Sequence, residues 1–99
     1  MPSFTITLTD ADTNYNVLAL VRAVDSDFVD QSRQVSISSD FDNDSENNVL
    51  GGDSHLDVTR YGWELAPGDS FTTPRHTTLL GTWVRSAAAA QVLHVEVTR

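Results

Sequence analysis

Apolar and polar residues alternate most regularly at the two ends of the chain. In residues 4–9, Phe, Ile and Leu are each followed by a threonine, and in residues 93–98 Leu, Val and Val alternate with His, Glu and Thr. Successive side chains of a β-strand point to opposite faces of a sheet, so a period of two indicates one buried and one exposed face. Both segments therefore predict half-buried strands.

A third alternating segment covers residues 33–41. Val35, Ile37 and Phe41 occupy inward positions of one register, and Ser39 fills the remaining inward position. This spacing predicts another half-buried strand.

Between the first and third of these segments the period changes. The apolar residues there recur at intervals of three and four, at Val17, Leu20, Val21, Val24 and Phe28. This spacing predicts a short helix over Asn14–Val24, with residues 10–13 offering side-chain acceptors to the exposed amides at its start. The run Val-Leu-Ala-Leu-Val is also typical of a buried strand, and periodicity alone does not separate the two in so short a stretch.

The central segment, residues 49–85, contains a turn with a chemical signature. In residues 65–69, Leu-Ala-Pro-Gly-Asp, proline presets the negative φ of the second turn position and glycine supplies the positive φ that a type II turn requires at the third. Tyr61 and Trp63 alternate with small or polar residues before this turn, and Phe71 follows it. The pattern predicts two strands joined as a β-hairpin.

Further strand signals lie on either side of this predicted hairpin. Residues 49–50 resume a strand that residues 51–53, Gly-Gly-Asp, should turn. After a polar loop, an alternating segment places Leu80, Thr82 and Val84 on its inward side, and residues 86–90 supply a small-residue turn.

The chain thus carries about seven strand signals and one helix signal in 99 residues. A chain of this length usually forms one domain around one core. We therefore expect a single mainly β domain over residues 1–99. Its architecture should be a small antiparallel β-sandwich or a partly closed barrel, with one short helix near residues 14–24.

Charge and composition narrow the classes of partner. Fourteen acidic residues against six arginines and no lysine give a formal net charge of −8. Nucleic acids and acidic membranes bind clustered positive charge, so neither is an expected partner. The chain has no cysteine, no apolar run approaches the ~20 residues that span a bilayer, and the first ten residues lack a basic region followed by an apolar stretch. We expect synthesis and retention in a cytoplasm until assembly.

The residues offer little for catalysis or metal binding. Asp40, Asp42 and Asp44 match three ligand positions of a calcium-binding loop, but Ser45 and Gly51 stand where glycine and glutamate are required. The predicted exposed loop over residues 40–48 is more typical of a solvated acidic segment, with a weak calcium site as the alternative. The three histidines share no ligand motif, and residues 68–70, Gly-Asp-Ser, lack the second glycine of a nucleophile elbow. We expect no enzyme activity, cofactor or metal.

Aromatic residues and arginines are concentrated in the central segment. These residue types are over-represented among interface anchors, and the residues concerned are Arg60, Tyr61, Trp63, Trp83 and Arg85. We predict that these five residues contact a partner. For each tryptophan the alternative is a place in the core.

One resemblance covers nearly the whole length. The order VLGGDS, RYGWELAPGDSF and LLGTWVRSAAAAQVLHVEV, preceded by TLTDADTNYNVLALVRAVD, resembles small structural proteins of tailed bacteriophages in which such a pattern closes a β-sandwich. Trp83 stands where a tyrosine or another bulky residue is expected, and Ala87–Ala90 replaces a glycine-containing turn. The pattern consists of turn and core residues, so the resemblance transfers no site residues.

The resemblance implies a virion protein without catalytic function. For a capsid decoration (cement) protein, it implies many copies on the outer capsid surface, bound to the major capsid protein, and a homo-oligomer such as a dimer or trimer. The alternative is a head- or tail-fibre module that recognises host-surface carbohydrate, with Trp63 and Trp83 stacking on a sugar ring.

Overall fold

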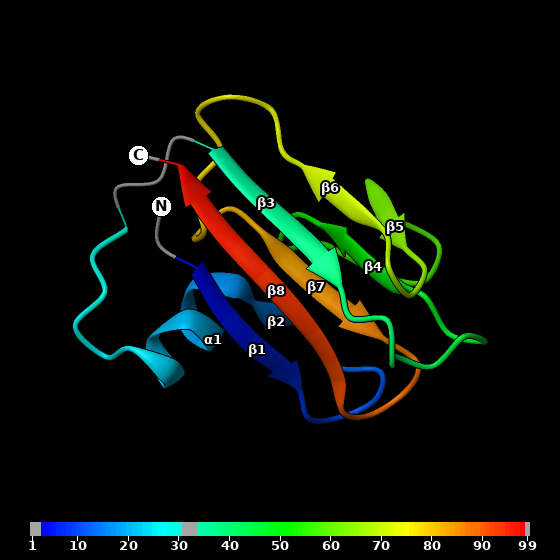
Figure 1. The fold of residues 1–99 in the computed structure, drawn as a ribbon. Helices are drawn as coiled ribbons and strands as arrows, with labels where there is room; N and C mark the ends of the chain where they lie inside the picture. Colours follow the sequence, from blue (N-terminus) through cyan, green and yellow to red (C-terminus); the bar gives the residue numbers. More distant parts are fainter. Residues whose placement is uncertain (1–2, 31–33, 99) are drawn as a thin grey trace.

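The computed structural model describes residues 3–30 and 34–98, which form two antiparallel four-stranded sheets packed face to face (Figure 1). Sheet A contains, in spatial order, β1 (Ser3–Leu8), β8 (Gln91–Thr98), β3 (Gln34–Ser39) and β6 (Ser70–Thr72). Sheet B contains β2 (Tyr15–Asn16), β7 (Trp83–Ser86), β4 (Val49–Gly52) and β5 (Trp63–Leu65). The predicted sandwich is confirmed. The two sheets stay separate over the described residues, so the barrel alternative is wrong.

The core lies between the sheets and follows the predicted alternation. β8 pairs with β1 on one side and with β3 on the other, and its inward residues Leu93, Val95 and Val97 are fully buried. Ile6 and Leu8 of β1 face the same core, whereas the threonines between them are exposed. Apolar area removed from water is the main stabilising contribution in a sandwich of this kind.

The helix α1 spans Val17–Val24, so the prediction of a helix beginning at Asn14 is wrong by three residues. Asn16 caps the helix by accepting a hydrogen bond from the Ala19 amide at 3.3 Å. Residues 15–16 instead pair with β7 as strand β2. Pairing with a distant strand competes with the helical conformation, and the local spacing of apolar residues does not contain that information.

The turn at residues 65–69 is confirmed, but the hairpin is wrong. Gly68 has a φ of +86°, and the Asp69 amide donates to the Ala66 carbonyl at 2.9 Å. However, β5 pairs with β4 in sheet B and β6 pairs with β3 in sheet A. The turn therefore carries the chain from one sheet to the other. Trp63 and Phe71 on either side of it stack between the layers, with ring centroids 4.9 Å apart.

Two glycines predicted to form a turn lie within a strand. Gly51 and Gly52 extend β4, opposite Val84 and Trp83 of β7. Gly51 is required there because a Cβ atom at this position would lie about 2.1 Å from the Trp63 indole. A glycine can therefore mark the close approach of a side chain as well as a turn.

Phe41 and Leu80 lie on the opposite face from the one predicted. Phe41, predicted to point inward, is 85% exposed because β3 ends at Ser39 and a turn follows, with the Asn43 amide donating to the Asp40 carbonyl. Arg33, at the other end of that predicted strand, lies outside the described residues.

The second error concerns Leu80, which is exposed, whereas Leu79 is fully buried. Hydrogen bonds from the Gly81 and Thr82 amides to Thr78 and Leu79 bend the chain before β7 begins at Trp83. A turn breaks the two-residue period, so alternation cannot be extrapolated across it. Thr82 and Val84 are buried as predicted.

Candidate functional site

The structure divides the five predicted contact residues between the interior, the outer face of sheet B and an exposed loop. Trp63 of β5 lies inside. It pairs with Gly51 of β4, which in turn pairs with the buried Val84, and residues paired across a sheet share a face. The indole covers Gly51 and stacks on Phe71, so Trp63 packs against the core.

Trp83 lies on the opposite face of the same sheet. It precedes the buried Val84 in β7 and pairs with Gly52 and Asn16, so its half-buried side chain points outward. Trp63 and Trp83 therefore cannot stack together on one sugar ring. The predicted two-tryptophan platform is wrong.

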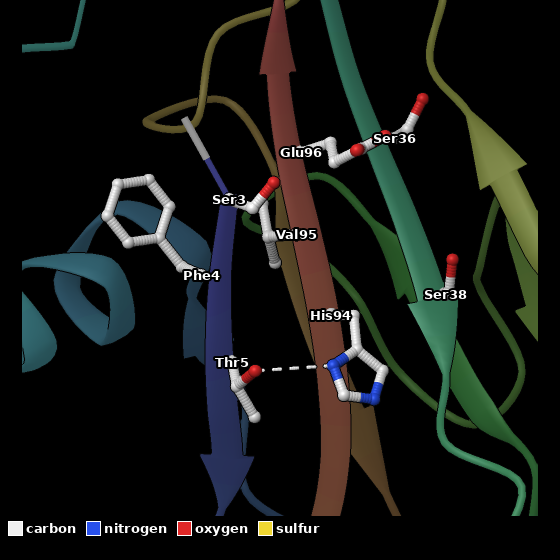
Figure 2. A pocket seen from close by; sticks show the side chains of 8 residues that line it. All are labelled: Ser3, Phe4, Thr5, Ser36, Ser38, His94, Val95 and Glu96. Carbon is white, nitrogen blue, oxygen red and sulfur yellow. Dashed lines mark hydrogen bonds between the residues drawn. The ribbon is translucent and has the colours of Figure 1, made fainter. Parts of the chain in front are cut away.

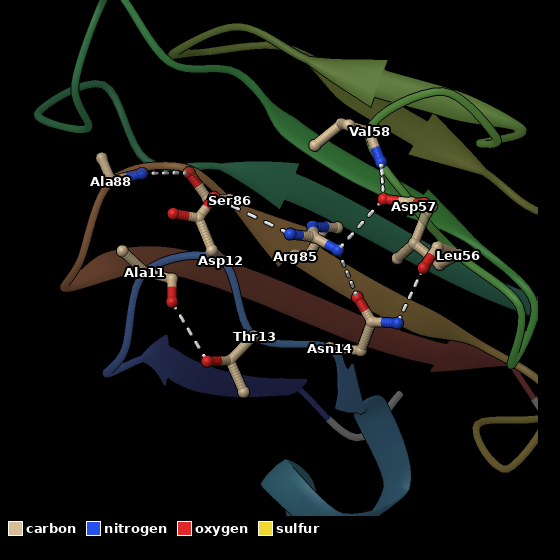
Figure 3. A network of polar contacts seen from close by, with 10 residues as sticks. All are labelled: Ala11, Asp12, Thr13, Asn14, Leu56, Asp57, Val58, Arg85, Ser86 and Ala88. Atoms are coloured by element: carbon tan, nitrogen blue, oxygen red, sulfur yellow. Dashed lines mark hydrogen bonds and ion pairs between the residues drawn. The ribbon is translucent and has the colours of Figure 1, made fainter.

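Arg85 is held in a network on the outer face of sheet B (Figure 3). Its guanidinium is 3.7 Å from the carboxylates of both Asp12 and Asp57, and it donates to the Asn14 side-chain oxygen at 3.2 Å. Asn14 in turn donates to the Leu56 carbonyl at 2.7 Å. With only 13% of its side chain exposed, Arg85 ties the turn after β1 and the loop after β4 to the sheet.

Arg60 and Tyr61 remain exposed, as a contact surface requires. The loop that carries them closes on itself through hydrogen bonds between the backbones of Asp57 and Arg60 in both directions, at 2.9 and 3.1 Å. Leu56 of the same loop is buried. Arg60 and Tyr61 border a cavity of about 230 Å³, whose other lining residues are Gly52, Asp53 and Gly62.

A groove that the sequence analysis does not predict lies on the outer face of sheet A (Figure 2). It has a volume of about 450 Å³ and crosses β1, β8 and β3. The polar residues that line it are Ser3, Thr5, Ser36, Ser38, His94 and Glu96, and Phe4 and Val95 complete the lining. The alternation in the sequence already contained the signal, because the outward positions of these strands are serine, threonine, histidine and glutamate. Hydroxyl groups both donate and accept hydrogen bonds, so this face suits a polyhydroxylated ligand.

His94 links this groove to the loop after β3. Its Nε2 lies 3.0 Å from an Asp40 carboxylate oxygen, and its Nδ1 lies 3.3 Å from the Thr5 hydroxyl. The hydrogen bond from His94 lowers the pKa of Asp40, and a second bond from the Asp42 amide lowers it further. Both carboxylate oxygens of Asp40 therefore take part in hydrogen bonds within the protein.

The acidic loop over residues 40–48 is fixed by two amide side chains. Asn43 donates to the Ser39 hydroxyl and the Val92 carbonyl at 2.8 and 2.7 Å, and accepts from the Val92 amide at 2.8 Å. The buried Gln91 accepts from the Asp44 amide and donates to the Asn47 carbonyl, at 2.9 and 2.8 Å.

Over residues 3–30 and 34–98, histidines and carboxylates do not gather in groups of three or more that could hold a metal ion. The same residues contain no helix long and apolar enough to cross a membrane. Comparisons with protein-family models, with curated proteins and with solved structures find no match for this chain.

Proposed function

We propose that this protein is a structural component of a bacteriophage virion, a capsid decoration (cement) protein that binds and stabilises the lattice of major capsid protein. The β-sandwich that the resemblance implies is the fold of the chain. The proposal places the protein on the outer capsid surface, as a homo-oligomer such as a dimer or trimer. It involves no catalysis.

The observation that carries the proposal is the loop bearing Arg60 and Tyr61. Both side chains are exposed, while the loop itself is anchored by the buried Leu56 and by the contact between Asp57 and Arg85. A loop that is already ordered loses little conformational entropy on binding, so a small contact can still contribute affinity. Repetition over a capsid lattice then converts weak individual contacts into firm attachment.

The proposal is tested on capsid shells assembled with and without the protein. We expect wild-type protein to sediment with the shells and to raise the temperature at which they disrupt. The double variant Arg60→Ala/Tyr61→Ala should bind more weakly. A matched control, Thr5→Ala/Ser38→Ala, removes two hydroxyl groups from the outer face of sheet A and should bind like the wild type. Shells that are equally heat-resistant with and without the wild-type protein would contradict the proposal.

The alternative is a head- or tail-fibre module that recognises host-surface carbohydrate. With the tryptophan platform excluded, its support is the polar groove on sheet A, whose volume of about 450 Å³ falls in the usual range for ligand pockets. Copy number separates the two functions, because hundreds of copies per virion fit a decoration protein and a handful fit a fibre. A glycan array should show binding that Ser36→Ala/Ser38→Ala weakens if the alternative is right.

A further inference from the structure

Phe41 is the most exposed large apolar side chain among the described residues, at 85%. It lies in the loop between β3 and β4, two residues after the buried Ser39. Isolated exposed apolar residues are common on protein surfaces, so exposure alone does not indicate a function. Two further properties of this loop distinguish Phe41.

The first property is rigidity. The loop on which Phe41 stands is fixed by the three hydrogen bonds of the Asn43 side chain. It is also joined to the turn at residues 66–69, because Ser39 accepts from the Gly68 amide and donates to the Asp69 carbonyl, at 2.9 and 2.8 Å. The Phe41 ring lies against Gly68, where a Cβ atom would come within 2.7 Å of it. The ring is therefore supported from below while its other side faces solvent.

The second property is charge. Segments 40–46 and 66–69, which this hydrogen bonding brings together, contain five carboxylates and no lysine or arginine. Their acidic residues are Asp40, Asp42, Asp44, Glu46 and Asp69. An apolar ring bordered by carboxylates complements an apolar pocket bordered by basic side chains, because charge complementarity steers association and desolvated aromatic side chains supply affinity.

We propose that Phe41 anchors this protein to the capsid lattice by entering an apolar pocket of the major capsid protein that is bordered by lysine or arginine. This inference rests on the proposed function and names one of its contacts. A protein that bridges neighbouring subunits needs more than one contact. The contact at Phe41 would therefore be made in addition to the one at the loop that carries Arg60 and Tyr61. A second copy of this chain is disfavoured as the partner that receives Phe41, because the acidic segments 40–46 and 66–69 of the two copies would repel each other.

The experiment measures binding of purified protein to shells that lack it, by sedimentation over a concentration series. Phe41→Ser should weaken binding by about tenfold or more, as loss of an anchor residue does. Leu80→Ser is the matched control, since Leu80 is also a large exposed apolar residue, at 63%, and lies outside segments 40–46 and 66–69. The separate variant Phe41→Tyr, which keeps the ring, should retain most of the wild-type affinity. Thermal unfolding of each variant checks that it folds.

The salt dependence supplies a second readout. Raising the ionic strength should weaken wild-type binding, and Asp42→Asn/Asp44→Asn should reduce that dependence, because fewer charges then face the basic border. If the wild type binds shells but Phe41→Ser binds equally well, or if Leu80→Ser loses as much, the inference is overturned while the proposed function stands. If the wild type itself does not bind shells, both are overturned.

Discussion

Gly51 tests whether the packing between Trp63 and β4 is as tight as the structure indicates. Replacing Gly51 by alanine would place a methyl group about 2.1 Å from the indole, far inside van der Waals contact. The ring cannot simply withdraw, because Phe71 stacks on it with a centroid separation of 4.9 Å. The substitution must therefore displace Trp63 or distort β4.

The expected magnitude follows from three contributions. Overpacking of a core costs about 1–3 kcal/mol, and losing the Trp63–Phe71 ring pair costs about 0.5–1.5 kcal/mol. Replacing glycine by alanine also restricts the unfolded chain, which stabilises the folded state and offsets about 0.4–1 kcal/mol of this cost. Gly51→Ala should therefore lower the free energy of unfolding by about 2 kcal/mol, which in a domain of this size lowers Tm by about 8–16 °C.

The assay is urea denaturation of Gly51→Ala beside a matched control, Gly62→Ala. Gly62 has no positive φ, and the nearest atom to a Cβ atom there would be the Gly51 carbonyl oxygen at 3.7 Å, so the control should not lower stability and should raise it by at most about 1 kcal/mol. In a Trp63→Leu background the cost of Gly51→Ala should largely disappear, because the obstructing ring is gone. A Gly51→Ala protein as stable as the wild type would refute the packing argument.

Three other substitutions test the remaining contacts. Asn43→Ala removes three hydrogen bonds from a partly buried side chain and should lower the free energy of unfolding by about 2–3 kcal/mol; an unchanged urea midpoint would contradict this. Asp40→Asn should lower Tm at pH 7, and the difference should shrink as the pH is lowered below about 3.9: because the folded-state pKa of Asp40 is lowered, its contribution is present above the unfolded-state pKa of about 3.9 and is lost as the pH falls through the folded-state value. A Tm difference independent of pH would exclude this linkage. Arg85→Met should cost only about 1 kcal/mol, and less in high salt, because Asp12 and Asp57 are mostly exposed.

At the two ends of the chain, the sequence alone determined that the segments are extended and which face of each is buried. The outcome for β1 and β8 matches the alternation residue by residue, because a period of two is a local property of extended backbone. The turn at residues 65–69 was equally predictable, since proline fixes a negative φ and glycine permits a positive φ without reference to the rest of the molecule.

Long-range pairing decided the rest. The turn sequence could not show that β5 and β6 join different sheets, nor that residues 15–16 pair with β7, because partners distant in the sequence compete for each strand. The same reason governs the candidate site. Trp63 and Trp83 have similar local patterns, yet the register with β4 places one inside and the other outside. Arg85 contacts Asp12 and Asp57 only after three distant segments meet. Phe41 became a surface residue because the strand before it ended two residues early.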